Sequence, residues 1–212
     1  MKATMNISEK IKNNKKKTLV RVYTNKRLKN SYQYVTIGEW NDIKDNLNHD
    51  FYVETICVNS ALDLLDTKEL KARIEYGAII RENVVIEEEA IVLMGAVINT
   101  GCFIGKKTMI DMGAILGGNA VVKENCHIGA NAVLAGTIEP YSEKSVVIEK
   151  DCLIGAGAII LEGIHVGEGS IIGANALVRE DIPPYSIAVG IPAKVIKKNE
   201  KEKFLVEDLR KI

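Results

Sequence analysis

A six-residue period governs the sequence between Ile74 and Val178. Every sixth residue is Ile, Leu or Val from Ile74 to Leu134, and again from Ile148 to Val178. The residue two positions before each of these is usually small, as at Ala90. A helix repeats every 3.6 residues and a strand every two, so neither explains this pattern. A strict hexapeptide repeat is typical of a parallel β-helix, in which one hexapeptide forms one flat face of the coil.

The repeat also indicates how such a rod holds together. The aliphatic side chain points into the shaft and stacks on its equivalents above and below. The small residue points inward near a corner, where a larger side chain would collide. Glycines such as Gly105 and Gly167 follow many aliphatic positions and let the backbone turn without a Cβ penalty. Burying one aliphatic side chain contributes about 1.5–3 kcal/mol, so the rod is expected to provide its own core.

The period pauses once, between Leu134 and Ile148. These residues are fourteen positions apart, which is eight more than one repeat. The extra residues must leave the rod, because its interior is closed to them. Long loops on a rigid scaffold are frequent carriers of function, so we expect the external loop at 135–147 to serve a site. A tolerated insertion is the alternative.

The flanking segments lack the period. Residues 1–71 are interpreted as a small α/β domain that caps one open end of the rod, with a strand at 18–23 and an amphipathic helix at 59–71. The rod itself is expected at 72–196. Pro183 and Pro184 stop the coil, and 197–212 is expected to be a charged C-terminal helix. The predicted fold is therefore mainly β, a parallel β-helix of hexapeptide repeats with a small domain at its start.

Composition excludes several classes of protein. Lys plus Arg and Asp plus Glu both number 28, so no net charge directs the chain to nucleic acid or a membrane surface. No apolar run approaches the ~18 residues of a membrane span, and no signal peptide is evident, so a cytoplasmic protein is expected. Cys102, Cys126 and Cys152 occupy small inward positions and are expected to pack as apolar residues, without disulfides.

A first candidate site is a pair of similar corners. Gly155-Ala156 and Gly173-Ala174 are 18 residues apart, so they stack if each coil has three faces. Stacked corners without bulky side chains leave a groove with exposed backbone amides, which suits an extended ligand that has amide groups of its own. Glycine that only turns the coil is the alternative.

A second candidate site combines an acid and a histidine. Asp111 follows an aliphatic position and so lies at a corner, and His127 lies near the same edge one coil further on. The two side chains could share a polar site in which either accepts a proton. An exposed corner histidine without a role is the alternative.

Specific motifs carry a resemblance to a known family. The hexapeptides and the closing segment Asp181–Lys194 resemble the coenzyme-A-dependent acyltransferases of the left-handed β-helix superfamily. Within it, the chain resembles the tetrahydrodipicolinate N-acyltransferases of the diaminopimelate route to lysine, and most closely their acetyl-transferring branch. The motifs are Met94-Gly-Ala-Val-Ile-Asn99, Thr108-Met-Ile-Asp111-Met112, Asn125-Cys-His127, Gly136-Thr-Ile-Glu-Pro140, Val147-Ile-Glu149 and Leu161-Glu-Gly163.

The resemblance implies a left-handed coil, acetyl-CoA as co-substrate, no metal, and a homotrimer with active sites between subunits. The amine would attack the thioester directly, without a covalent enzyme intermediate. By this resemblance Asp111 is the first choice to orient or deprotonate the amine, and Gly190, Pro192 and Lys194 are candidates for binding acetyl-CoA. The stacked corners Gly155, Ala156, Gly173 and Ala174 are expected to bind acetyl-CoA as well, His127 is the second candidate base, and Glu162 and Glu139 are further carboxylate candidates, for catalysis and for the substrate. The two substrate carboxylates need cations, for which Arg81, Lys106, Lys107 and Lys123 are available, and the sequence does not choose among them.

Other readings remain. Succinyl-CoA could be the donor, or a sugar or serine hydroxyl the acceptor, within the same superfamily. A γ-type carbonic anhydrase needs about three histidine ligands for zinc. Only His49, His127 and His165 exist. His49 is outside the rod, and the other two fall on different faces if the loop is confined to one coil. A non-catalytic scaffold is the third reading.

Overall fold

The computed structural model describes residues 7–28, 31–47, 50–138 and 142–198. The chain divides into two compact units, residues 1–63 and 64–212. None of the helices in the described ranges is long and apolar enough to cross a membrane.

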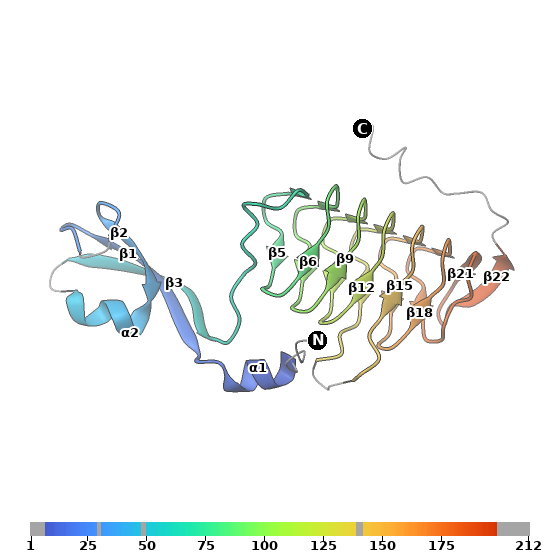
Figure 1. Cartoon of the computed structure of the whole chain (residues 1–212), viewed down its shortest axis with the longest axis horizontal. Coiled ribbons are helices and arrows are strands. Elements are labelled where there is room, and N and C mark those ends of the chain that lie inside the picture. Colours follow the sequence, from blue (N-terminus) through green and yellow to red (C-terminus); the bar gives the residue numbers. More distant parts are fainter. Residues whose placement is uncertain (1–6, 29–30, 48–49, 139–141, 199–212) are drawn as a thin grey trace. The chain divides into compact units, whose positions relative to one another are not determined.

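The N-terminal unit is a small antiparallel sheet with short helices (Figure 1). Its strands lie in the order β2-β1-β3. The elements are α1 (Ile7–Asn13), β1 (Lys17–Thr24), β2 (Val35–Glu39), α2 (Trp40–Ile43), the 3₁₀ turn η1 (Lys44–Asn46) and β3 (Phe51–Ser60). Val20, Val22 and Ile43 form its core, which the alternation of β1 directs to one face. The strand expected at 18–23 is confirmed. The role of this unit as a cap stays a prediction.

The helix expected at 59–71 is wrong. Strand β3 extends to Ser60, and the segment that follows forms turns and an isolated bridge between Leu64 and Arg81. The apolar spacing has another cause, since Leu65 and Leu70 pack against the core of the rod. The amide of Leu65 also donates to the carbonyl of Ile80 at 2.9 Å. The rod unit therefore begins at Leu64, not at the expected residue 72.

The second unit is a left-handed parallel β-helix with three faces, and Figure 1 shows its successive coils side by side. The first face contains β4 (Arg73–Ile74), β7 (Ile91–Val92), β10 (Met109–Ile110), β13 (His127–Ile128), β16 (Leu153–Ile154) and β19 (Ile171–Ile172). The second contains β5 (Ile79–Ile80), β8 (Val97–Ile98), β11 (Ile115–Leu116), β14 (Val133–Leu134), β17 (Ile159–Ile160) and β20 (Leu177–Val178). The third contains β6 (Val85–Ile86), β9 (Phe103–Ile104), β12 (Val121–Val122), β15 (Val147–Ile148) and β18 (His165–Val166).

Each two-residue strand presents its first residue outward and its second inward. The inward aliphatic residues from Val92 onward are fully buried, and the small residues two positions before them are buried as well. Cys102, Cys126 and Cys152 are buried free thiols at these small positions. The six-residue period thus places the core as expected.

The interruption is confined to one coil. Val121 pairs with Val147, 26 residues later, whereas undisturbed coils pair residues 18 apart, as Ile79 does with Val97. The loop does not leave the rod at once, because Thr137 and Ile138 are buried. The side chain of Ile138 lies over Gly118, where an added Cβ would be 1.9 Å from its Cδ1 atom.

The C-terminal end closes the first face. Strand β21 (Ser186–Val189) pairs in parallel with β19, and β22 (Lys194–Lys198) pairs antiparallel with β21. Lys197 and Lys198 therefore lie in a strand and not in the helix expected at 197–212. The rest of that expected helix lies outside the described residues.

Candidate active site

Corner residues stack in register along the rod. After the first face the stacked positions are Asp111, Gly129, Gly155 and Gly173, because the strands before them pair as Ile110, Ile128, Ile154 and Ile172. We call this edge the acid corner. Successive coils are about 4.8 Å apart, so Asp111 lies one coil from Gly129 and two from Gly155. Asp111 and the glycine pair thus belong to one continuous edge of one chain.

Asp111 and His127 share a polar contact on this edge. The Nε2 atom of His127 lies 3.3 Å from Oδ2 of Asp111. The other carboxylate oxygen, Oδ1, accepts a hydrogen bond of 2.7 Å from the amide of Met112. The two side chains are largely covered, with exposed fractions of 15% for His127 and 19% for Asp111. The sequence correctly placed them near one edge, one coil apart.

The glycine corners stack as closely as the sequence indicates. A Cβ on Gly155 would lie 2.5 Å from the amide nitrogen of Ala174, so a side chain does not fit there. The carbonyl of Ala156 accepts a hydrogen bond from Asn175 at 2.9 Å. Ala156 and Ala174 are exposed, and their N–H groups have no hydrogen-bond partner within the described ranges. Both amides are therefore candidate donors for a ligand that carries carbonyl groups at similar spacing.

The closing segment covers the last coil beside these corners. The amide of Leu177 donates to the carbonyl of Gly190 at 3.0 Å, and the amide of Ala193 donates to the carbonyl of Leu177 at 2.8 Å. Pro192 lies between these two contacts. Val189 packs over Gly173, where an added Cβ would be 2.7 Å from its Cγ1 atom.

A cavity of about 210 Å³ lies on the far side of the closing segment. Lys194 and Arg179 both line this cavity. Lys194 was predicted from the sequence as a site residue, and Arg179 was not. Arg179 directly follows the last buried position of the repeat, Val178, and that placement could have drawn attention to it. Glu180 and Asp181 line the same cavity, so its two cations are balanced by two carboxylates.

The remaining candidates lie on other corners. Glu162 is exposed on the corner after the second face, following β17. Arg81 lies on the same corner near the start of the rod, and its Nη1 atom donates to Asn99 at 3.3 Å. Lys106 lies on the third corner and forms ion pairs with Glu88 at 2.5 Å and Glu89 at 3.2 Å. Glu139 lies outside the described residues.

One charged group on the third face was missed by the sequence. Glu149 accepts hydrogen bonds from Lys123 at 2.9 Å and contacts the Nε2 atom of His165 at 2.9 Å. The hydrogen bond from Lys123, helped by His165, holds the pKa of Glu149 below its ordinary value of 4.5. His165 lies on the third face and His127 on the first, as the sequence predicted.

The cysteines are poorly suited to act as nucleophiles. Burial raises the pKa of the Cys102 thiol to about 12, and burial raises the pKa of the Cys126 thiol well above its usual range. A reactive cysteine needs the opposite, a thiolate that reaches solvent. The described residues also contain no group of three or more His, Cys, Asp or Glu side chains arranged to hold a metal ion.

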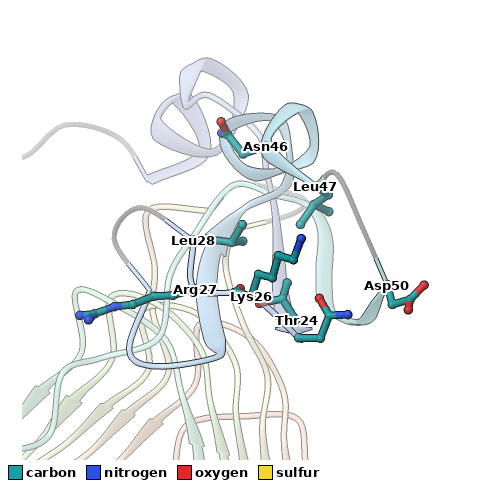
Figure 2. Close-up of a pocket in the computed structure, with 8 residues that line it drawn as sticks. Thr24, Lys26, Arg27, Leu28, Asn46, Leu47 and Asp50 are labelled. Atoms are coloured by element: carbon teal, nitrogen blue, oxygen red, sulfur yellow. Dashed lines mark hydrogen bonds between the residues drawn. The ribbon is translucent and has the colours of Figure 1, made fainter.

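The N-terminal unit has a separate pocket of about 250 Å³ (Figure 2). It lies between the end of β1 and the segment after η1. Figure 2 shows Leu28 and Leu47 on either side of Lys26, while Arg27 points away from them. None of the predicted site residues lies in this pocket.

Comparison with known proteins shows the family of the chain. Residues 101–136 and 145–180 match the bacterial transferase hexapeptide family (six repeats). A 2,3,4,5-tetrahydropyridine-2,6-dicarboxylate N-acetyltransferase from Anoxybacillus flavithermus is 57% identical over 216 residues, covering 93% of this chain and 92% of that protein. A protein of the same name from Fervidobacterium nodosum is 50% identical over 232 residues, covering 97% and 93%.

A solved structure shows the same fold with a ligand. The acetyltransferase domain of PglB from Neisseria gonorrhoeae, in complex with acetyl coenzyme A, aligns with a TM-score of 0.55 and 25% identity. The match covers 60% of this chain and 58% of that one. Given its identity to the two relatives over nearly its whole length, this chain belongs to the family of 2,3,4,5-tetrahydropyridine-2,6-dicarboxylate N-acetyltransferases.

Proposed function

We propose that this protein transfers an acetyl group from acetyl-CoA to the amine of tetrahydrodipicolinate, giving N-acetyl-2-amino-6-oxopimelate for diaminopimelate and lysine biosynthesis. The observation that carries the proposal is the 57% identity to a relative of that name, which extends over 93% of this chain. The motifs around Asp111 and His127 lie on the rod, where Asp111, Gly155 and Gly173 share one edge.

Acetyl transfer requires an uncharged amine near the thioester. Tetrahydrodipicolinate is a cyclic imine, so one water adds across its C=N bond, which supplies the amine and, once the ring opens, the 6-oxo group of the product. The amine nitrogen forms a bond to the acetyl carbon, the carbon–sulfur bond breaks, the nitrogen loses a proton and the departing thiolate gains one. Asp111 is the proposed group that orients the amine and takes its proton, because its carboxylate is fixed at both oxygens yet still partly exposed. An exposed backbone N–H of the acid corner would stabilise the oxyanion. Glu162 is a further carboxylate for this step.

Acetyl-CoA would lie along the glycine groove. Its pantetheine arm carries two amide groups, and the free N–H groups of Ala156 and Ala174 are donors of the kind that such an arm needs. Gly155 and Gly173 let the adjacent coil and Val189 pack closely at these corners. Gly155, Gly173, Gly190 and Pro192 are proposed to border the bound acetyl-CoA. Lys194 would then meet the nucleotide phosphates.

The two carboxylates of the acceptor need cations. Arg81 is the stronger of the two proposed residues, since among the described residues its guanidinium has a hydrogen bond to the uncharged Asn99 and no ion pair. Lys106 is already neutralised by Glu88 and Glu89, which also raise its pKa. Glu139 remains a proposed contact of the substrate from the external loop.

The site is proposed to form between subunits of a homotrimer in the cytoplasm. Asp111 and Glu162 lie on different corners of one rod, so a second rod is needed to bring a Glu162 beside an Asp111. A subunit interface would also enclose acetyl-CoA between two walls, which excludes water from the thioester.

A release assay for free thiol tests the donor and the acceptor together. Acetyl-CoA and succinyl-CoA are each offered at equal concentration with tetrahydrodipicolinate, serine or an amino sugar. We expect turnover with acetyl-CoA and tetrahydrodipicolinate to exceed every other pair. Faster release with succinyl-CoA would favour a succinyltransferase, and faster release with serine or the sugar would favour another acetyltransferase of the superfamily. Failure to bind acetyl-CoA would favour a non-catalytic scaffold.

A further inference from the structure

The position of His127 restricts what its imidazole can do. It is the outward residue of β13, and its neighbours in register on the first face are Met109 and Leu153. Both neighbours are partly covered, so the ring lies in an apolar row. Only 15% of the His127 side chain is exposed.

The two ring nitrogens have different surroundings. Nε2 lies 3.3 Å from Oδ2 of Asp111. Nδ1 is buried and has no hydrogen-bond partner within the described part of the chain. The flanking Leu153 has no polar atom, and Met109 has only a thioether, which is a weak acceptor.

This geometry conflicts with a role of His127 as the general base. An imidazole accepts a proton through a nitrogen lone pair that the substrate can reach. Nε2 is directed at a carboxylate, with which it can pair only as a donor. A proton added at Nδ1 would produce a buried N–H without an acceptor, and a charged ring makes that burial costlier still.

We infer that His127 is a positioning residue: as a neutral imidazole protonated at Nε2, it donates a hydrogen bond to Asp111 and holds that carboxylate toward the substrate. The inference rests on the proposed function, in which Asp111 receives the proton of the amine. It replaces the alternative in which His127 itself is the base.

The contacts of Asp111 show why a second donor matters. The amide of Met112 fixes Oδ1, but a single hydrogen bond leaves the carboxylate free to rotate about its Cβ–Cγ bond. The contact from His127 to Oδ2 removes that freedom. Each oxygen keeps a lone pair for the incoming amine, because an ionised carboxylate accepts about four hydrogen bonds.

A double-mutant cycle tests the kinetic side with the full-length protein. His127→Leu removes the donor, whereas His127→Gln keeps an amide N–H near the position of Nε2. We expect His127→Leu to lower kcat by about tenfold to a hundredfold, His127→Gln to stay within about fivefold of wild type, and KM for acetyl-CoA to remain unchanged. In an Asp111→Asn background, His127→Leu should have almost no further effect.

Two results would overturn the inference. If His127→Gln is as slow as His127→Leu, a proton acceptor is required at this position. If the losses of His127→Leu and Asp111→Asn multiply, the two residues act independently. Met109→Leu, one coil away on the same face, is the matched control and should retain wild-type kinetics. Thermal unfolding of each variant separates a catalytic loss from a loss of folded protein.

Nitrogen-15 NMR of the imidazole ring provides a readout that does not depend on activity. We expect the Nε2-protonated, neutral form of His127 at neutral pH in wild type. A ring protonated at Nδ1 would overturn the inference even if the enzyme is active. A wild-type protein without turnover on tetrahydrodipicolinate would instead contradict the proposed function, while the NMR result would still decide the state of His127.

Discussion

Asp111 and Glu162 lie on different corners of the same rod, Asp111 directly after β10 of the first face and Glu162 two residues after β17 of the second. Two side chains on separate edges of a filled β-helix cannot both contact one small substrate, because the packed shaft lies between them. If both act on one acetyl transfer, they must come from two chains.

Complementation between inactive variants tests that arrangement. Asp111→Asn and Glu162→Gln are each expected to be slow, and a refolded equal mixture of the two should regain activity. In random homotrimers about a quarter of the interfaces would combine an intact Asp111 with an intact Glu162. Recovery to about a quarter of the wild-type rate supports shared sites, whereas no recovery would show that both carboxylates serve a site within one chain.

Close stacking at the glycine groove predicts a large stability cost for Gly155→Ala. The added Cβ would lie 2.5 Å from a backbone nitrogen and 2.7 Å from the carbonyl carbon of Gly173, so adjacent coils must separate. We expect the free energy of unfolding to fall by about 1–3 kcal/mol or more, measured in urea at fixed protein concentration. Ala156→Ser at the neighbouring exposed corner is the control and should change it by less than about 0.5 kcal/mol. An unaltered Gly155→Ala protein would contradict the close approach of the coils.

The four cysteines should differ sharply in reactivity. Cys102, Cys126 and Cys152 are buried, and Cys57 is partly exposed. Burial and the raised pKa of the Cys102 and Cys126 thiols disfavour the reactive thiolate. Titration with an aromatic disulfide reagent should therefore detect about one thiol in the native protein and four after denaturation. Rapid reaction of several thiols in the native state would show that the shaft opens.

The pair formed by Lys123 and Glu149 predicts a pH-dependent contribution to stability. The hydrogen bond from Lys123 lowers the pKa of Glu149 from its ordinary value of 4.5, so the folded state holds the ionised carboxylate more strongly than the unfolded state does. The stabilisation that this pair gives to the folded state is complete at pH values above the ordinary pKa of 4.5. It declines as the pH falls through the lower pKa that Glu149 has in the folded state. Because the pair is partly exposed, we expect Glu149→Gln to cost only about 0.5 kcal/mol at pH 7.

Urea unfolding at neutral pH and at pH 3 checks this sign. The difference between wild type and Glu149→Gln should shrink at the lower pH. Glu124→Gln makes the same change of charge on the adjacent coil and should have little effect at either pH. A difference that grows on acidification would contradict the assigned direction of the pKa.

The repeat made the rod predictable because the residues of each hexapeptide determine the inward and outward positions of one face. An inward aliphatic residue such as Ile110 and a small inward residue such as Ala114 restrict each face independently, so the 18-residue coil and the neighbourhood of Asp111 and His127 follow from counting. The confinement of the loop to one coil was a condition for placing His165, and the pairing of Val121 with Val147 meets it. What counting could not give was how an outward side chain is turned, such as the ring of His127, whose Nδ1 is buried.

The segments without the six-residue period were harder to predict from the sequence. Leu65 and Leu70 have helical spacing, but their apolar side chains are used to cover the rod, and tertiary packing outweighed the local pattern. Arg179 was not predicted as a site residue, because it meets Lys194 only after β22 has folded back along the end of the rod. Long-range pairs of this kind have no signature in a single sequence.

The central claim is that this protein acetylates tetrahydrodipicolinate with the help of the Asp111 carboxylate. Its most direct test is the initial rate of CoA release from acetyl-CoA with that acceptor, for wild type and Asp111→Asn at equal concentrations of folded protein. The amide cannot accept the proton of the amine, so the account predicts a fall in kcat of about a hundredfold or more with little change in KM for acetyl-CoA. An Asp111→Asn enzyme with the wild-type rate would contradict it.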